Sequence, residues 1–331
     1  MDLQPLGRTG VSVTELCLGA MMFGAFGNPD HDESIRIIHR ALDAGINFID
    51  TADFYSAGES ETIVGKALAG RRDDVVLATK VGLPLDDDPN HRGTSRRWIT
   101  RAVEDSLRRL QTDWIDLYQV HRLDPHTDLD ETLGVLSDLV HAGKIRAFGA
   151  SNVPASQIVE AQWLAERRGR ERFRTEQPPY SPLTRAIEHD VLPTAKRYGM
   201  GVLTYSPLAG GWLSGAYRKG REIAGPNAAA RRERFAAMYD ASSAENAAKL
   251  DAADALGALA DESGLTLIQL AIAFVTRHPA VTSAIVGPRT MAHLESYLAA
   301  DGVQLSDDVL ARIDAIVPPA HTVNVADNGW S

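Results

Sequence analysis

Short apolar runs that each end on a polar residue constrain the fold of this chain more than any other feature. The runs are INFID (46–50), VVLATK (75–80) and DLYQVH (116–121), rich in Val, Ile, Leu and aromatic residues. Polar or Gly/Pro segments bound each run, and stretches with helical periodicity separate them, which is typical of buried parallel strands. Because a (β/α)8 barrel carries its chemistry at the carboxyl ends of its strands, this pattern predicts such a barrel.

The rest of the chain alternates strands and helices in the order that a parallel barrel requires. We expect an amino-terminal hairpin that closes the bottom, and extra helices at 245–260, 265–277 and 306–317. We interpret residues 1–331 as one α/β domain, a (β/α)8 TIM barrel with long loops at its mouth. The strands are expected to end near Gly19, Asp50, Lys80, His121, Ser151, Gln177, Tyr205 and Gly287, with helices at 32–44, 95–110, 130–142, 154–168 and 186–198.

Four residues at expected strand ends form a chemically coherent set. A tyrosine such as Tyr55 is a poor acid, with an ordinary pKa near 10, so it donates a proton only when a neighbour stabilises its phenolate. The Lys80 cation can do this, and Asp50 can hold that cation charged and oriented. His121 can hydrogen-bond a carbonyl oxygen. Together they describe a site that polarises and protonates C=O while a hydride arrives from elsewhere.

Several spaced motifs cover nearly the whole chain. They are LGRTGVSVTELCLGAMMFG (6–24), DAGINFIDTADFYSAGESETIVGKAL (43–68), ATKVG (78–82), FGASN (148–152), YSPLAGGWLSG (205–215) and IVGPRT (285–290). Together these motifs resemble those of the aldo-keto reductase family. The resemblance implies one barrel that reduces an aldehyde or ketone with NADPH. It also implies Tyr55 as general acid, His121 orienting the carbonyl oxygen, and Lys80, supported by Asp50, lowering the pKa of Tyr55.

The resemblance also assigns the cofactor site, since the chain has no G-x-G-x-x-G fingerprint, no Walker A sequence and no metal-ligand spacing. The sequence departs from the commoner family pattern at two positions. Many relatives have Gln or Arg where this chain has His293, and Asn where it has Tyr297. The resemblance places Ser151, Asn152 and Gln177 at the nicotinamide amide, Tyr205 on its ring, Ser206, Leu208 and Gly210 at the pyrophosphate, and Gly287, Arg289 and His293 at the adenosine phosphate.

Loops at the mouth are expected to determine substrate choice. Residues 208–244 are glycine-rich and lack a regular pattern, so we expect a mobile loop whose start covers the cofactor, with a flap at about 218–240 that is mobile or disordered. The carboxyl-terminal tail, 318–331, could close over the substrate. The candidate apolar pocket residues are Phe23, Phe54, Trp212 and Trp330.

Composition excludes other classes of protein. The net charge of -10 argues against nucleic-acid binding, which requires a basic surface. No stretch approaches a membrane span of roughly 18 uncharged apolar residues. Cys17, the single cysteine, is expected to be inert core, and with no signal peptide visible we expect a cytoplasmic location. The partner is then a small-molecule carbonyl substrate, whose identity, like the oligomeric state, the sequence does not indicate.

Alternative interpretations of these residues stay open. Asp50 and Lys80 could form a structural ion pair, His121 could be a core histidine, and Arg289 could be an exposed cation at a helix start. Lys80 could instead be the nucleophile of a Schiff-base barrel aldolase. The family resemblance also includes channel-associated regulatory subunits, which bind the nicotinamide cofactor with slow turnover.

Overall fold

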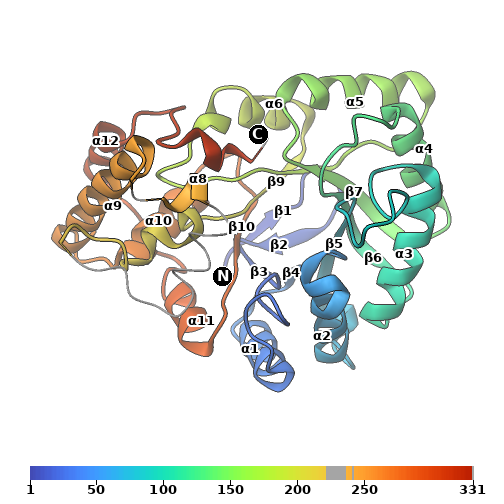
Figure 1. Cartoon of the computed structure of the whole chain (residues 1–331), viewed down its shortest axis with the longest axis horizontal. Coiled ribbons are helices and arrows are strands. Elements are labelled where there is room, and N and C mark those ends of the chain that lie inside the picture. The colour runs from blue at the N-terminus through green and yellow to red at the C-terminus, as the bar shows by residue number, and fades with distance from the viewer. Residues whose placement is uncertain (221–235, 241, 330–331) are drawn as a thin grey trace.

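A computed structural model describes residues 1–220, 236–240 and 242–329. Eight parallel strands form a closed barrel in the order β10-β3-β4-β5-β6-β7-β8-β9, as the sequence predicts. A separate antiparallel pair, β1 (Leu3–Pro5) and β2 (Ser12–Thr14), forms the expected amino-terminal hairpin. Figure 1 shows helices α1 to α6 surrounding the strands in chain order.

The barrel strands end where the apolar runs end. Each ends within one residue of its predicted end, so the change from apolar to polar residues was a good guide to the strand ends. The strands are β3 (Leu16–Gly19), β4 (Phe48–Asp50), β5 (Val76–Val81), β6 (Ile115–Val120), β7 (Ile145–Ser151), β8 (Thr175–Gln177), β9 (Gly201–Thr204) and β10 (Ser283–Val286).

Several of the helices begin at side-chain caps. Ser95, for example, accepts a hydrogen bond from the Trp98 N–H at the start of α3, and Thr266 forms a capping box with Gln269 at the start of α10. The helices are α1 (His31–Asp43), α2 (Glu59–Ala67), α3 (Arg96–Leu110), α4 (Leu129–His141), α5 (Ala155–Arg168), α6 (Val191–Tyr198), α8 (Ala236–Tyr239), α9 (Ala244–Glu262), α10 (Leu267–Thr276), α11 (Met291–Leu298) and α12 (Asp307–Ile316).

The helix predicted over 186–198 is shorter than expected. The chain forms a 3-10 turn at Ala186–Glu188, and the α-helix begins only at Val191. Pro193 lies in the first turn of this helix, the position where a residue without an N–H removes no intrahelical bond. A helix that began at residue 186 would instead place this proline in its interior.

The lower half of the barrel interior is apolar and plugged by the hairpin. Side chains two residues apart on a strand point the same way, so Phe48 and Ala78 face inward one layer below Asp50 and Lys80. Cys17 lies in this buried layer, as predicted. The members of the layer are Leu6, Val13, Cys17, Phe48, Ala78, Leu117, Leu203 and Ile285. The polar side chains that point into the barrel, such as Asp50 and Lys80, therefore lie at the carboxyl ends of the strands.

The three extra helices form as predicted. α9 and α10 lie between β9 and β10, α12 follows α11, and Figure 1 shows α9, α10 and α12 together at one side of the barrel. In the described part of the chain, no single helix has the length and apolar character to cross a membrane. One sharply bent pair of helices, Ala237–Glu262 with Leu267–Thr276, meets that test by length and composition only.

Candidate active site

Lys80 joins the predicted catalytic residues into one hydrogen-bonded group. Its buried ammonium donates to Asp50 Oδ1, to the Thr51 carbonyl at 3.0 Å and to the Tyr55 hydroxyl oxygen at 3.2 Å. The His121 ring lies edge-on to the Tyr55 ring with centroids 5.7 Å apart. An ammonium only donates, so the phenol proton of Tyr55 stays available for another acceptor.

The charge of Lys80 is stabilised inside the barrel. Burial alone favours the neutral amine, but the neighbouring Asp50 and Tyr55 outweigh it and raise the pKa of Lys80. Burial raises the pKa of Tyr55 above 10.0 and exceeds the lowering effect of Lys80. Lys80 acts on the pKa of Tyr55 in the predicted direction, but burial outweighs it, so Tyr55 keeps its proton at neutral pH.

His121 is held as a neutral imidazole. Burial, together with the positive charges of Lys80 and Arg122, lowers the pKa of His121 well below 6.5. Its Nδ1 is buried and has no hydrogen-bond partner among the described residues. If the neutral ring carries its proton on Nε2, the only unsatisfied group at Nδ1 is a lone pair. The Nε2–H is then a donor for a carbonyl oxygen.

Two glutamines complete the environment of Asp50. Gln119 Nε2 and Gln177 Nε2 each donate to Asp50 Oδ2 at 3.0 Å, and Gln177 also donates to Gln119 Oε1 at 3.2 Å. Sequence reasoning missed Gln119. It lies two residues before His121 on β6, so strand alternation turns both side chains to the barrel interior and could have indicated it.

The residues expected at the nicotinamide amide lie together at the ends of β7 and β8. Ser151 Oγ donates to the Gln177 carbonyl at 2.8 Å, and Asn152 Nδ2 donates to Ser151 Oγ at 2.9 Å. The Tyr205 hydroxyl donates to Asn152 Oδ1 at 2.7 Å. Asn152 has a left-handed backbone, with φ of 58°, which turns its side chain into this group.

Glu176, which sequence reasoning also missed, supports this turn from behind the barrel wall. Its Oε1 accepts a hydrogen bond from the Val153 N–H at 2.8 Å, while its Oε2 has no partner among the described residues. Burial raises the pKa of Glu176 to about 8, against the lowering effect of the Val153 and Asn152 backbone N–H groups. Successive side chains on a strand point to opposite faces. Because Gln177 points into the barrel, its neighbour Glu176 on β8 could have been predicted to point outward.

The segment expected at the pyrophosphate is a tightly turned loop after β9. Positive φ values occur at Ser206 (56°), Ala209 (48°), Gly210 (66°) and Gly211 (102°). The Gly210 carbonyl accepts a hydrogen bond from the Tyr239 hydroxyl at 2.8 Å. Leu208 is buried beneath the same loop. Of the predicted loop at 208–244, residues 221–235 and 241 lie outside the described part, including most of the expected flap.

The residues expected at the adenosine phosphate lie at the start of α11. Gly287 is exposed, and a Cβ there would meet only the Gly19 carbonyl at 3.8 Å, so a ligand can approach its backbone. Arg289 is half-buried, and no ion pair of its guanidinium occurs in the described ranges. His293 is exposed, and its ring lies 6.5 Å from that of Tyr297.

The candidate substrate aromatics are only partly at the surface. Phe23 and Trp212 are 0% and 1% exposed, so the expectation that they line an open pocket is wrong for this arrangement. Trp212 stacks on Tyr217 at 4.3 Å, because the segments after the loop fold over it. Phe54 is half-buried and packs edge-on against a neighbouring phenylalanine. Trp330 lies outside the described residues.

The described part of the tail packs against two residues expected at the nicotinamide, Asn152 and Tyr205. A Cβ on Gly329 would collide with Asn152 Oδ1 and with the Tyr205 hydroxyl, so the tail backbone packs directly on that hydrogen bond. A buried ion pair anchors it, with Lys249 Nζ 2.6 Å from Asp327 Oδ2.

A second anchor links the tail to α9 and to the segment before it. Asn324 Nδ2 donates to Asn246 Oδ1 at 2.8 Å and to the Ala237 carbonyl at 2.9 Å. The tail, the start of α9 and the segment just before α9 are therefore held together.

Comparisons with known proteins agree with this geometry. The family model for the aldo/keto reductase family matches residues 15–318. An uncharacterised oxidoreductase, YrpG, of Bacillus subtilis (strain 168) is 39% identical over 329 residues, covering 96% of each chain. The aldo-keto reductase YhdN of the same organism is 35% identical, covering 96% of this chain and 94% of its own. A probable voltage-gated potassium channel subunit beta of Oryza sativa subsp. japonica is also 35% identical, covering 96% and 97%. The chain therefore belongs to the aldo/keto reductase family of oxidoreductases.

Proposed function

We propose that this protein reduces the carbonyl group of an aldehyde or ketone with NADPH, using Tyr55 as the proton donor. The observation that carries the proposal is the hydrogen bond from Lys80 Nζ to the Tyr55 oxygen, at 3.2 Å. It leaves a protonated phenol beside a fixed positive charge, which is the arrangement that a general acid for an alkoxide product requires.

Each residue of the site then has a defined task. Tyr55 donates its proton to the substrate oxygen, and Lys80 stabilises the phenolate that remains. Asp50 keeps Lys80 charged and in place. His121 donates a hydrogen bond from Nε2 to the same oxygen, which orients the carbonyl and polarises it before the proton moves.

The residues around the mouth fit a nicotinamide dinucleotide. Ser151, Asn152 and Gln177 together offer hydroxyl, amide donor and amide acceptor groups, which a carboxamide needs. The open backbone at Gly287 and the guanidinium of Arg289, beside the first turn of α11, suit a phosphate. When bound, NADPH supplies a hydride from nicotinamide C4. The protein itself contributes position, electrostatics and the proton.

The pocket residues expected from sequence enter this proposal only in part. Phe54 remains a candidate apolar contact at the mouth, whereas Phe23 and Trp212 are too buried to touch a substrate in this arrangement. The tail near Gly329 is the described segment best placed to limit which carbonyl compounds reach Tyr55.

The aldolase alternative is less well supported. A Schiff base forms from a neutral amine, but Asp50 and Tyr55 together raise the pKa of Lys80, so the amine stays protonated.

The regulatory alternative draws on the name of the potassium channel subunit relative. The aldolase predicts no reductase turnover and the regulatory subunit predicts slow turnover at most, and this separates both from the proposal.

The direct test is NADPH oxidation over a panel of aldehydes, diketones, quinones and sugars, followed by identification of the alcohol product. Turnover that requires a carbonyl substrate and disappears in Tyr55→Phe supports the proposal. Tight NADPH binding without turnover on any panel member would favour the regulatory function instead. Borohydride trapping of substrate on Lys80 would favour the aldolase.

A further inference from the structure

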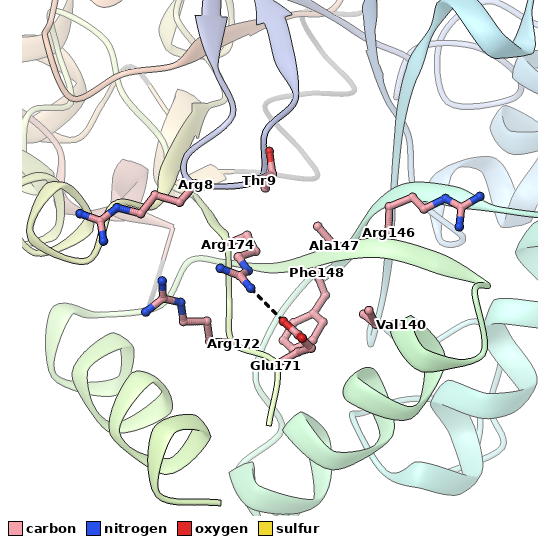
Figure 2. Close-up of a pocket in the computed structure, with 9 residues that line it drawn as sticks. All are labelled: Arg8, Thr9, Val140, Arg146, Ala147, Phe148, Glu171, Arg172 and Arg174. Carbon is pink, nitrogen blue, oxygen red and sulfur yellow. Dashed lines mark hydrogen bonds and ion pairs between the residues drawn. The ribbon is translucent and has the colours of Figure 1, made fainter. Parts of the chain in front are cut away.

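A basic pocket lies at the amino-terminal end of the barrel, opposite the candidate active site. We use this name for the cavity of about 250 Å³ in Figure 2. Arg146, near the start of β7, lines the pocket. Ser151, at the end of the same strand, is one of the residues proposed for the nicotinamide amide. At about 3.3 Å per residue the two ends of this strand lie roughly 20 Å apart. The pocket is lined by Arg8, Thr9, Val140, Arg146, Ala147, Phe148, Glu171, Arg172 and Arg174.

The charges of the basic pocket are not balanced by the protein. Four arginines face one carboxylate, Glu171, which is already paired with Arg174 at 2.8 Å. In the described parts of the chain, no carboxylate lies within ion-pair distance of Arg8, Arg146 or Arg172. This concentration of positive charge occurs in a protein of net charge -10. Because like charges repel, a bound anion would stabilise the pocket.

A second cavity on the same barrel shows that this imbalance is local. It is lined by Arg108 and Lys144 together with Glu104 and Asp113. Lys144 pairs with Glu104, and Arg108 pairs with Asp105. Cavities on this surface are therefore not generally basic.

Three of the arginines lie on the same side of the pocket. Figure 2 shows the side-chain ends of Arg8, Arg172 and Arg174 on one side of the pocket and that of Arg146 on the other. The backbone of Arg8 is fixed by its N–H, which donates to the Gly199 carbonyl at 3.0 Å. Gly199 also leaves space for the Arg8 side chain, because a Cβ there would collide with it.

We propose that the basic pocket binds a small anion bearing phosphate groups, held mainly by Arg8 and Arg172. Guanidinium groups present several N–H donors in a planar fork, which matches the oxygens of a phosphate. The volume exceeds several-fold the ~30 Å³ that one water molecule occupies in the liquid. The site is separate from the cofactor site, so the ligand is a distinct molecule from the reducing cofactor.

Calorimetric titration with inorganic pyrophosphate at low ionic strength tests this site. Every protein in the series carries Arg289→Gln, which removes the guanidinium expected to hold phosphate at the cofactor site. The test protein adds Arg8→Gln and Arg172→Gln. The control adds Arg108→Gln and Arg167→Gln, two arginines outside the pocket, so that it loses the same charge.

We expect pyrophosphate to bind the parent protein at one site. The test protein should bind it at least about 10-fold more weakly, and the control should bind it as the parent does. An equal loss in test and control proteins would overturn the proposal, because it would show general charge attraction. Absence of binding to the parent would also overturn it. Neither outcome bears on carbonyl reduction, which is measured separately with the unmodified Arg289 protein.

Discussion

Glu176 holds the backbone that follows β7, because its Oε1 accepts a hydrogen bond from the Val153 N–H at 2.8 Å. The side chain is buried, and one of its oxygens lacks a partner among the described residues. The carboxyl group therefore favours its protonated form, in which it can still accept this bond. Because the bond fixes the turn at Asn152, the protonation state of Glu176 is linked to folding stability and, under the proposed function, to cofactor binding.

Glu176 should make the protein less stable as the pH rises. Its pKa is raised from 4.5 to about 8, so between these values the folded state binds a proton that the unfolded state does not. The free energy of unfolding consequently falls across this window and levels off above it. Urea unfolding at several pH values should show this slope. In Glu176→Gln, which cannot ionise, the slope should be reduced; an unchanged slope would mean that Glu176 does not titrate as inferred.

Tyr55→Phe should retain NADPH binding and lose turnover by roughly 100-fold or more, because it removes only the proton donor. Single-turnover kinetics with a reactive aldehyde measures this loss, and cofactor fluorescence measures binding. Lys80→Met should be comparably damaging, since it removes the charge that stabilises the phenolate. If Tyr55→Phe turned over at the parental rate, the phenol would have no part in the reaction.

Arg289→Ala should weaken NADPH binding by about 1.5 to 3 kcal/mol and barely change NADH binding, because a guanidinium recognises the additional phosphate. The half-buried position of Arg289, beside the first turn of α11, supports this expectation. Dissociation constants for both cofactors, measured at one ionic strength, give the comparison. Equal losses for the two cofactors would assign Arg289 a structural role.

Asp327→Asn should destabilise the protein by about 3 to 5 kcal/mol, because it leaves the buried Lys249 charge without its partner. The double variant Lys249→Met/Asp327→Asn should recover much of that loss, since no unpaired charge remains. Urea unfolding of the parent, both single variants and the double variant completes the cycle. Independent, additive effects would show that the ion pair does not anchor the tail.

Removing the tail after Pro319 should change the ranking of carbonyl substrates while NADPH affinity changes little. The truncation deletes Asn324, Asp327 and Gly329, which connect the tail to α9 and to the Asn152–Tyr205 hydrogen bond. Specificity constants over the same aldehyde and ketone panel measure the effect. An identical ranking before and after truncation would remove the tail from substrate selection.

The barrel and its four catalytic candidates were predictable because both depend on local sequence. Each apolar run ends where its strand leaves the core, and the parallel arrangement brings Asp50, Lys80 and His121 to one end. Gln119 followed from the same alternation and was simply overlooked.

Contacts between distant segments were not predictable in this way. Trp212 was expected to line an apolar substrate pocket because it lies on a loop at the mouth, but it stacks against Tyr217 and Tyr239 and is buried. The Lys249–Asp327 pair joins residues 78 positions apart in the chain, and no periodicity or spacing rule identifies such a partner. Whether a loop residue is buried depends on which other segments fold over it. The sequence of the loop alone does not contain that information.

The closeness of Gly329 to the Asn152–Tyr205 hydrogen bond has a practical consequence for handling this enzyme. A purification tag fused after Ser331 would begin three residues beyond Gly329, which packs on two residues proposed for the nicotinamide, Asn152 and Tyr205. At the other terminus, the Met1 ammonium lies 3.4 Å from Asp301, near the hairpin that closes the opposite end. Kinetic constants obtained with a carboxyl-terminal tag would then report on the tag as well as on the enzyme, whereas an amino-terminal tag would begin at the other end of the barrel.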